Sequence, residues 1–252
     1  MPHTTADHRR PALARRAAVS LVGAAALAAV AGAHSPSHAY AGPTVADQPL
    51  TDFSDCPALP AGADPARWRC EVHTAAPQLS MGKMTVTLAP ITMTHAEGPL
   101  PDGTKGQVWG AMHSTPTAVP GGFPAPVVSE HARLRGLAIQ PEYGGRSDFY
   151  TGQFSLRFRL LSPQLAPNCT IGADAPIDFQ LKRSGPSQWV SQDPPLIKFS
   201  AYDDTFIAPA AEHCGPLTRL LNQRLGLPAA SGNLMTYDAA YTFKTYDQLP
   251  TR

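Results

Sequence analysis

Alternation of apolar and polar residues is the feature of this sequence that most restricts its fold. In the segment 235–243 every second residue is apolar or aromatic, and polar or small residues lie between them. Successive side chains of a β-strand point to opposite faces, so a period of two predicts a strand with one buried face. The same alternation occurs at 83–88, 91–95, 154–160, 177–182 and 197–201, and more weakly at 107–113 and 133–140.

Seven or eight half-buried strands favour a mainly β fold, an antiparallel β-sandwich or barrel-like domain. One short helix is predicted at 216–225, because Pro216 suits the first helical position and Gly226 suits a helix end. The Pro-rich segment 115–127 is open to two interpretations, a domain boundary or a long surface loop. The predicted apolar stripe of the helix is Leu217, Leu220, Leu221 and Leu225, and its hydrated face is Arg219, Asn222 and Gln223.

Residues 1–41 have the three parts of a cleavable signal peptide. Four arginines begin it, the run 17–33 carries no charge, and Ala39-Tyr40-Ala41 forms an A-x-A cleavage site. The apolar run is short and poor in Leu and Ile, which argues against a membrane span. We therefore expect the leader to be removed, by the general or the twin-arginine export route, and the protein to be secreted without membrane attachment.

The mature chain is nearly neutral. Removal of four arginines and Asp7 from the 20 basic and 19 acidic residues leaves 16 and 18, a net charge of −2. No Lys/Arg cluster follows Gly42. Nucleic acids and anionic membranes both require a basic surface, so neither is expected as a partner. We expect an irregular N-terminal arm at 42–80, rich in Pro, Ala, Asp and Gly, and a β-rich domain at 81–252.

Four cysteines, Cys56, Cys70, Cys169 and Cys214, all follow the cleavage site. An even number in an exported chain predicts disulfides and an oxidising compartment. Of the three possible pairings we favour Cys56 with Cys70 and Cys169 with Cys214, since each bridge then stays within one local unit. The spacings contain no C-x-x-C and fit no zinc pattern.

Methionine and histidine are concentrated in one stretch, from Met81 to His113. Both are usual copper ligands in an oxidising compartment. We take Met93, His95, Met112 and His113 as candidate copper ligands, and expect the first two to share one face of a strand. The alternative is ordinary core packing, with methionine filling gaps. Apart from this alternative, no cofactor is expected.

Tyr143, Arg146 and Trp189 are candidate ligand-binding residues. They fall in segments that resemble loop tips, 143–146 and 187–189, and binding residues are frequent on loops. Exposed aromatic rings can stack on sugars, although most aromatic side chains belong to a core or its rim. A cell-wall glycan, or another envelope protein, is therefore the expected partner.

Local enzyme motifs are missing from the sequence: it has no nucleophile elbow, P-loop, dinucleotide-binding motif, H-E-x-x-H or EF-hand loop. The dipeptides Glu130-His131 and Glu212-His213 would point to opposite faces of a strand. We therefore expect a secreted non-catalytic binding or cell-envelope-associated protein. The alternatives are an extracytoplasmic copper-binding protein and a hydrolase that acts on extracellular or cell-wall polymer.

Several segments resemble uncharacterised exported proteins of high-GC actinobacteria. They are Cys56-Pro-Ala-Leu, Trp68-Arg-Cys-Glu-Val, Asn168-Cys-Thr-Ile-Gly and Cys214-Gly-Pro-Leu-Thr-Arg-Leu-Leu-Asn-Gln-Arg-Leu-Gly-Leu-Pro. The Ala-rich leader agrees with this resemblance. It implies a type of host and transfers no activity and no catalytic residue.

Overall fold

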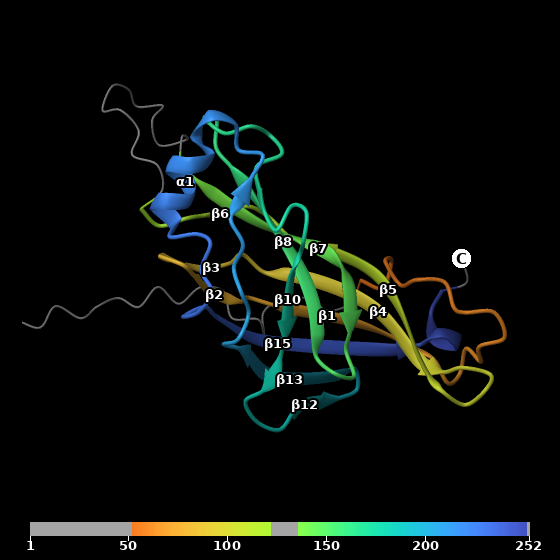
Figure 1. Cartoon of the computed structure of the whole chain (residues 1–252). Coiled ribbons are helices and arrows are strands. Elements are labelled where there is room, and N and C mark those ends of the chain that lie inside the picture. The colour runs from red at the N-terminus through yellow and green to blue at the C-terminus, as the bar shows by residue number, and fades with distance from the viewer. Residues whose placement is uncertain (1–51, 122–135, 251–252) are drawn as a thin grey trace, which may run out of the picture. The chain divides into compact units, whose positions relative to one another are not determined.

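The alternating segments form antiparallel strands in the computed structural model, which describes residues 52–121 and 136–250 (Figure 1). The expected signal peptide, the dipeptide Glu130-His131 and the start of the strand expected at 133–140 lie outside the described residues. All described residues belong to one structural unit. The expectation of a mainly β, antiparallel fold with one short α-helix is confirmed for this part of the chain.

The larger sheet has nine strands among the described residues and the order β11-β13-β15-β1-β4-β5. The strand β12 pairs with β13, and β2 pairs with both β15 and β3. The strands are β1 (Arg69–Ala75), β2 (Gln78–Met81), β3 (Met84–Thr87), β4 (Ile91–Pro99), β5 (Lys105–His113), β11 (Lys182–Arg183), β12 (Gln188–Gln192), β13 (Pro195–Asp203) and β15 (Leu234–Thr245).

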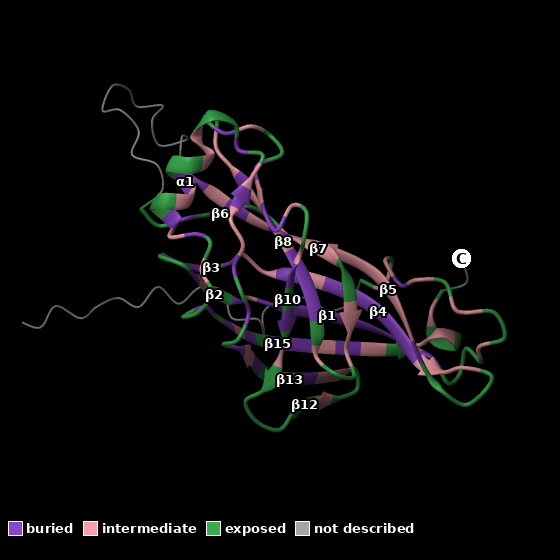
Figure 2. Ribbon diagram, viewed as in Figure 1, coloured by how far each residue is buried: buried purple, intermediate pink, exposed green. Residues whose placement is uncertain are grey.

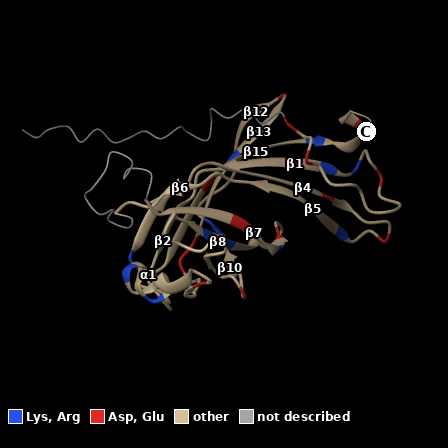
Figure 3. Cartoon of the chain, turned by 90° about the horizontal axis from the view of Figure 1, so that it is seen from above, with Lys and Arg blue, Asp and Glu red and all other residues tan. Residues whose placement is uncertain are grey.

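The smaller sheet has six described strands in the order β14-β9-β8-β7-β6, with β10 paired to β8. They are β6 (Thr117–Ala118), β7 (Ala138–Asp148), β8 (Gln153–Leu161), β9 (Thr170–Ile171), β10 (Ile177–Gln180) and β14 (Ala211–Glu212). Figure 3 shows β13, β15, β1, β4 and β5 in one layer and β7, β8 and β10 in another. Buried apolar residues of both sheets form one shared core, as in a sandwich (Figure 2).

The strand β1 corrects the expectation of an irregular arm over 42–80. It lies at the centre of the larger sheet, between β15 and β4. Its sequence shows no apolar alternation because one face carries the polar side chains of Arg69, Glu71 and His73. All residues of the strand except Arg69 are nevertheless buried. Directly before it, Trp68 is fully buried against Gly98, and its indole N–H donates to the carbonyl oxygen of Pro99 at 2.7 Å.

Both favoured disulfide pairings are confirmed. The arm disulfide, Cys56–Cys70, ties the segment before β1 to the strand, and the helix disulfide, Cys169–Cys214, ties the start of β9 to the helical segment. All four cysteines are therefore oxidised. Disulfides of this kind persist in oxidising compartments, which indicates an extracytoplasmic environment.

The helix lies close to its expected position. A 3-10 turn, η3 (Gly215–Leu217), leads into α1 (Thr218–Leu225), and a second turn, η4 (Tyr246–Gln248), follows β15. Two side-chain expectations for the helix are wrong. Leu220, expected on the apolar stripe, is 53% exposed. Asn222, expected on the hydrated face, accepts a hydrogen bond from the backbone N–H of Ala211 and donates one to its carbonyl oxygen. Asn222 thus docks the helix onto β14. Within the described residues, no helix is long and apolar enough to cross a membrane.

Candidate functional site

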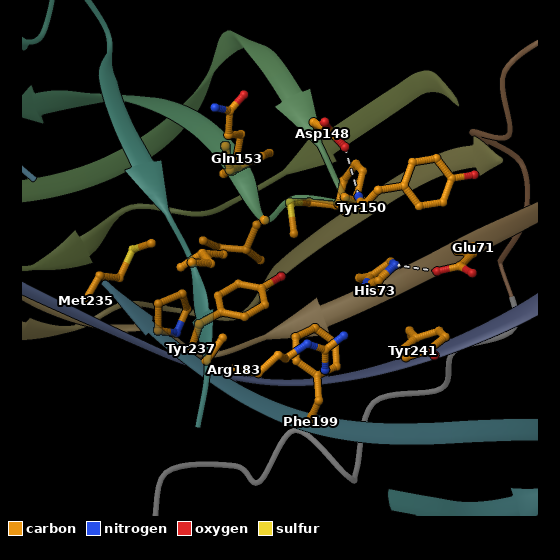
Figure 4. A pocket seen from close by; sticks show the side chains of 18 of the residues that line it. Glu71, His73, Asp148, Tyr150, Gln153, Arg183, Phe199, Met235, Tyr237 and Tyr241 are labelled. Atoms are coloured by element: carbon orange, nitrogen blue, oxygen red, sulfur yellow. Dashed lines mark hydrogen bonds and ion pairs between the residues drawn. The ribbon is translucent and has the colours of Figure 1, made fainter. Parts of the chain in front are cut away.

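A cavity of about 330 Å³ lies between the two sheets. On one side its wall is formed by side chains from β1, β4, β13 and β15, and on the other by the β7–β8 turn and β8. Figure 4 shows these side chains converging from both sheets. Most of the wall is apolar or aromatic, and includes Met93, Phe149, Phe154, Leu156, Phe199 and Tyr241.

Five polar side chains gather at one end of the cavity because of the β1–β4 register; four of them line its wall, and the fifth, His95, lies beside them. Arg69 lies opposite Glu97, Glu71 opposite His95, and His73 opposite Met93. Residues two apart on a strand share a face, so the polar side chains of both strands point to the same side of the sheet. We call Arg69, Glu71, His73, His95 and Glu97 the polar cluster.

Ion pairs and hydrogen bonds connect most of the polar cluster. Nε2 of His73 is 3.0 Å from Oε2 of Glu71 (Figure 4), and Nε of Arg69 is 2.6 Å from Oε1 of Glu71. The same Arg69 Nε also lies 3.0 Å from Oε1 of Glu97. The side chain of Glu71 is only 5% exposed. Arg69 therefore bridges two carboxylates, one of which is deeply buried.

His95 differs from the other members of the cluster because its ring nitrogens have no hydrogen-bond partner among the described residues. Its side chain is 1% exposed. Its Nε2 lies 3.8 Å from Oε2 of Glu71 and 3.6 Å from Oε2 of Glu97. Both distances are too long for a hydrogen bond.

The cluster shifts the pKa values of its members in different directions. Burial lowers the pKa of His73, although its hydrogen bond with Glu71 opposes the shift. Burial alone would raise the pKa of Glu97, but the neighbouring His95 and Arg69 outweigh it and lower the pKa to about 2. Burial also tends to lower the pKa of Arg69, and the two carboxylates reverse this and raise it. The arrangement therefore favours neutral His73 and an ionised Glu97.

Aromatic rings cover both imidazoles. Phe149, between β7 and β8, stacks on His95 with ring centroids 3.7 Å apart and planes 5° from parallel. Tyr241 of β15 stacks on His73 at 4.9 Å. These contacts hold the imidazole planes and shield the two imidazoles, whose side chains are 7% and 1% exposed, from bulk water.

Two further polar groups lie on the cavity wall. The guanidinium of Arg183 stacks 3.6 Å from the ring centroid of Phe199, and no carboxylate in the described residues lies within ion-pair distance of it. Burial lowers the pKa of Arg183. The hydroxyl of Tyr237 is buried without a hydrogen-bond partner in the described part of the chain, and burial raises its pKa. Both groups could bind a polar group of a ligand.

The structure does not bring the four candidate copper ligands together as one set. Met93 is buried on the cavity wall and pairs across the strands with the partly buried Met112. His95 belongs to the polar cluster. His113 lies at the surface, where its Nε2 is 2.6 Å from Oδ2 of Asp55. Among the described residues, the side chains of Glu71 and His73 bring possible ligand atoms close to His95, and His113 is not part of this group.

The expectation of loop tips for the three candidate ligand-binding residues is wrong, because Tyr143 and Arg146 lie in β7 and Trp189 lies in β12. The glycines after Tyr143 form an irregularity in the β7–β8 register rather than a turn. Tyr143 stacks on Trp109 at 3.8 Å, and Arg146 pairs with Asp178 at the surface. Trp189, in the other sheet, is 53% exposed.

Glu71, His73 and Glu97 are not among the site residues expected from the sequence. The Glu-His pairs singled out there are adjacent dipeptides, whose side chains diverge on a strand, whereas the pairs of the site have one residue between them. The sequence pattern that could have predicted the polar cluster is Glu71-x-His73 followed by His95-x-Glu97. Two such motifs on neighbouring antiparallel strands bring all four side chains to one face.

Comparison with known proteins identifies no relative: no family model, curated protein or solved structure matches the chain. The fold and the site define the chain only as a disulfide-bonded protein of two antiparallel sheets with an internal cavity. What the cavity does has to be inferred from its own chemistry.

Proposed function

We propose that this chain is a secreted, non-catalytic binding protein that holds a small ligand between its two sheets. The main support for this proposal is the cavity, whose volume of about 330 Å³ falls within the range of small-molecule binding sites. Such sites are usually apolar and contain a few polar groups that fix the ligand. The disulfides and the expected signal peptide support a location outside the cytoplasm.

The chemistry of the wall favours a small organic acid with an apolar or aromatic body. The rings of Phe149 and Phe199 offer surface to the body of the ligand. Arg183 offers a cation without a carboxylate partner among the described residues, and guanidinium binds carboxylates with directed hydrogen bonds. The hydroxyl of Tyr237 can donate a further bond to such a group. An acid would thus give the Tyr237 hydroxyl a partner and would neutralise Arg183, an exposed residue whose Nη1 donates a hydrogen bond to Oγ of Ser187.

Binding of phenylacetate and octanoate tests this proposal, with phenylacetamide and octanamide as uncharged controls. We expect at least one acid to raise the melting temperature of the secreted chain, and calorimetry to give one site. Arg183→Gln should weaken binding of the acid roughly 10- to 100-fold, the effect of losing a charge-assisted hydrogen bond.

The matched control is Arg146→Gln, since Arg146 is exposed and pairs with Asp178 away from the cavity. It should bind the acid as the unmodified chain does. Equal binding of acids and amides, or equal loss in both arginine variants, would exclude Arg183 as the acid-binding group. Absence of binding by any probe would refute a cavity for organic acids.

A cell-wall contact is a second proposal, favoured by the exposed surface of β12. Trp189 and Val190 are each 53% exposed on this edge strand, and an exposed indole can stack on a sugar face. Cosedimentation with insoluble peptidoglycan should decrease in Trp189→Ala and not in Leu220→Ala, which alters a comparably exposed apolar residue on α1. Equal retention of the two variants would count against the contact.

The polar cluster does not favour the hydrolase alternative. Acid–base hydrolysis by two carboxyl groups needs one of them protonated near neutral pH. Glu97 has its pKa lowered, and Glu71 is held in an ion pair with Arg69. A glycosidase-like acid is therefore not formed by this pair.

A further inference from the structure

We infer that the polar cluster is a binding site for one divalent first-row transition-metal ion, with Glu71, His73 and His95 as its protein ligands. This site is separate in its chemistry from the organic-acid site proposed above. It rests on the positions of the ligand atoms, on the unpaired state of His95 and on the charge of the cluster.

The ligand atoms already lie close to the spacing that a metal requires. One ligand atom from each of the three side chains lies within 4.8 Å of the other two. Oε2 of Glu71 is 3.0 Å from Nε2 of His73 and 3.8 Å from Nε2 of His95. Ligand bonds of 2.0–2.1 Å in tetrahedral geometry place neighbouring ligand atoms about 3.3 Å apart. Side-chain shifts of about 1 Å therefore complete the set around an ion.

His95 gives the second, independent observation. It is buried, stacked beneath Phe149, and has no hydrogen-bond partner for either nitrogen among the described residues. Leaving a buried polar group unpaired is unfavourable, and such groups need an explanation. An ion between Glu71 and His95 would occupy the 3.8 Å gap that is too long for a hydrogen bond and would ligate the imidazole.

The charge of the cluster is suited to a dication. With both imidazoles neutral, as metal ligation requires, two carboxylates, Glu71 and Glu97, face one guanidinium, which leaves one buried negative charge for the ion to compensate. Arg69 binds Oε1 of Glu71 and fixes the carboxylate orientation, and a metal would replace the hydrogen bond between Oε2 of Glu71 and Nε2 of His73 by ligating both atoms. Such outer contacts commonly orient metal ligands. Glu97, whose Oε2 is 3.6 Å from Nε2 of His95, is placed to support that ring or to act as a fourth ligand.

Two imidazoles and one carboxylate select the class of metal. Calcium and magnesium prefer oxygen ligands, whereas imidazole suits zinc, copper, cobalt and iron. This donor set differs from the copper set expected from the sequence, with which it shares only His95. Three protein ligands leave a coordination position free, as in many reactive or ligand-binding zinc sites. Glu71 and His73 line the cavity, so the ion can enter from it.

Calorimetric titration of the EDTA-treated, oxidised secreted chain with Zn²⁺, Cu²⁺ or Co²⁺ tests the inference. We expect one ion per chain, a raised melting temperature, and no comparable effect of Ca²⁺ or Mg²⁺. Because all four cysteines are in disulfides, bound Co²⁺ should give visible absorption without a thiolate charge-transfer band. Bound Cu²⁺ should show coupling to two imidazole nitrogens in its electron paramagnetic resonance spectrum.

Variants then assign the ligands. His73→Gln and His95→Gln should each weaken Zn²⁺ binding at least about 100-fold, more than changes in outer contacts usually do. His113→Gln is the matched control, since it removes an exposed histidine that pairs with Asp55. Arg183→Gln should retain metal binding even if it loses organic-acid binding, so the two proposals can fail separately.

Circular dichroism checks that each variant is folded. If one histidine variant fails to fold, the copper spectrum of the unmodified chain and the other histidine variant still decide the question. No binding of any of the three transition ions, a copper spectrum without imidazole coupling, or equal loss in His113→Gln would overturn the inference.

Discussion

Replacement of Glu97 by Gln tests the electrostatics of the polar cluster directly. The pKa of Glu97 is lowered from 4.5 to about 2. A shift of this size corresponds to roughly 3 kcal/mol of folding free energy at neutral pH, at about 1.4 kcal/mol per pKa unit. His95 and Arg69 are the groups that lower this pKa, and Arg69 is 39% exposed, so solvent screening reduces the effect. We expect Glu97→Gln to lower the free energy of unfolding by about 2 kcal/mol at pH 7.

The sign of the pH dependence follows from the lowered pKa. The folded protein holds Glu97 ionised at pH values where the unfolded chain already binds a proton. The stabilisation by Glu97 is therefore complete above its unfolded pKa and is lost as pH falls through about 2. The difference between the unmodified chain and Glu97→Gln should shrink steadily as pH falls from about 5 to about 2.

Urea unfolding in EDTA at several pH values between 2 and 7 measures this difference. Glu142→Gln is the control, because Glu142 is 42% exposed and its Oε1 is 3.4 Å from Nε of Arg159. An exposed pair of this kind contributes less than about 1 kcal/mol. A loss in Glu97→Gln that is the same at pH 2.5 and pH 7, or no larger than that in Glu142→Gln, would refute the electrostatic explanation.

Two predictions concern the scaffold around the site. Removal of the helix disulfide by Cys169→Ser with Cys214→Ser should lower the free energy of unfolding by about 4 kcal/mol, because its cysteines are 45 residues apart. Removal of the arm disulfide, whose separation is 14, should lower it by about 3 kcal/mol; the reverse order in urea unfolding would contradict the loop-length explanation. Gly98→Ala should destabilise the protein by about 1–3 kcal/mol, because a Cβ there would lie 2.6 Å from Cγ of buried Trp68. Gly136→Ala meets nothing within 4 Å, and equal melting temperatures of the two alanine variants would show that the Trp68 contact is not tight.

The sheets were predictable wherever one strand face is apolar. The alternating residues from Met235 to Phe243 fall within β15, and Met235, Tyr237 and Ala239 are buried. The disulfides were predictable for a different reason. Pairing each cysteine with its nearest neighbour in sequence closes short loops and keeps each bridge within one local unit. Both signals depend only on residues that are near in sequence or repeat along one strand.

The central strand was not predictable by the same reasoning. In β1 the face that an apolar pattern would fill carries Arg69, Glu71 and His73. On its opposite face Cys70 is joined to Cys56, and residues of both faces are buried, so the polar–apolar contrast is lost. The polar cluster also needs the β1–β4 register, which aligns Glu71 with His95 across 24 positions of sequence.

The failure of the pattern at β1 is itself informative about function. Replacing buried charges by apolar residues of similar size is often neutral or stabilising, so folding alone gives little reason for Glu71, His73, His95 and Glu97 in an interior. Local rules are usually broken at functional or strained sites. Here the break lies in the strand at the centre of the larger sheet, beside a cavity, and it leaves one histidine without a partner in the described structure. A bound ion accounts for the unpaired imidazole, the excess negative charge and the ligand spacing together, whereas a purely structural network accounts only for the contacts of Arg69 and for the Glu71–His73 bond.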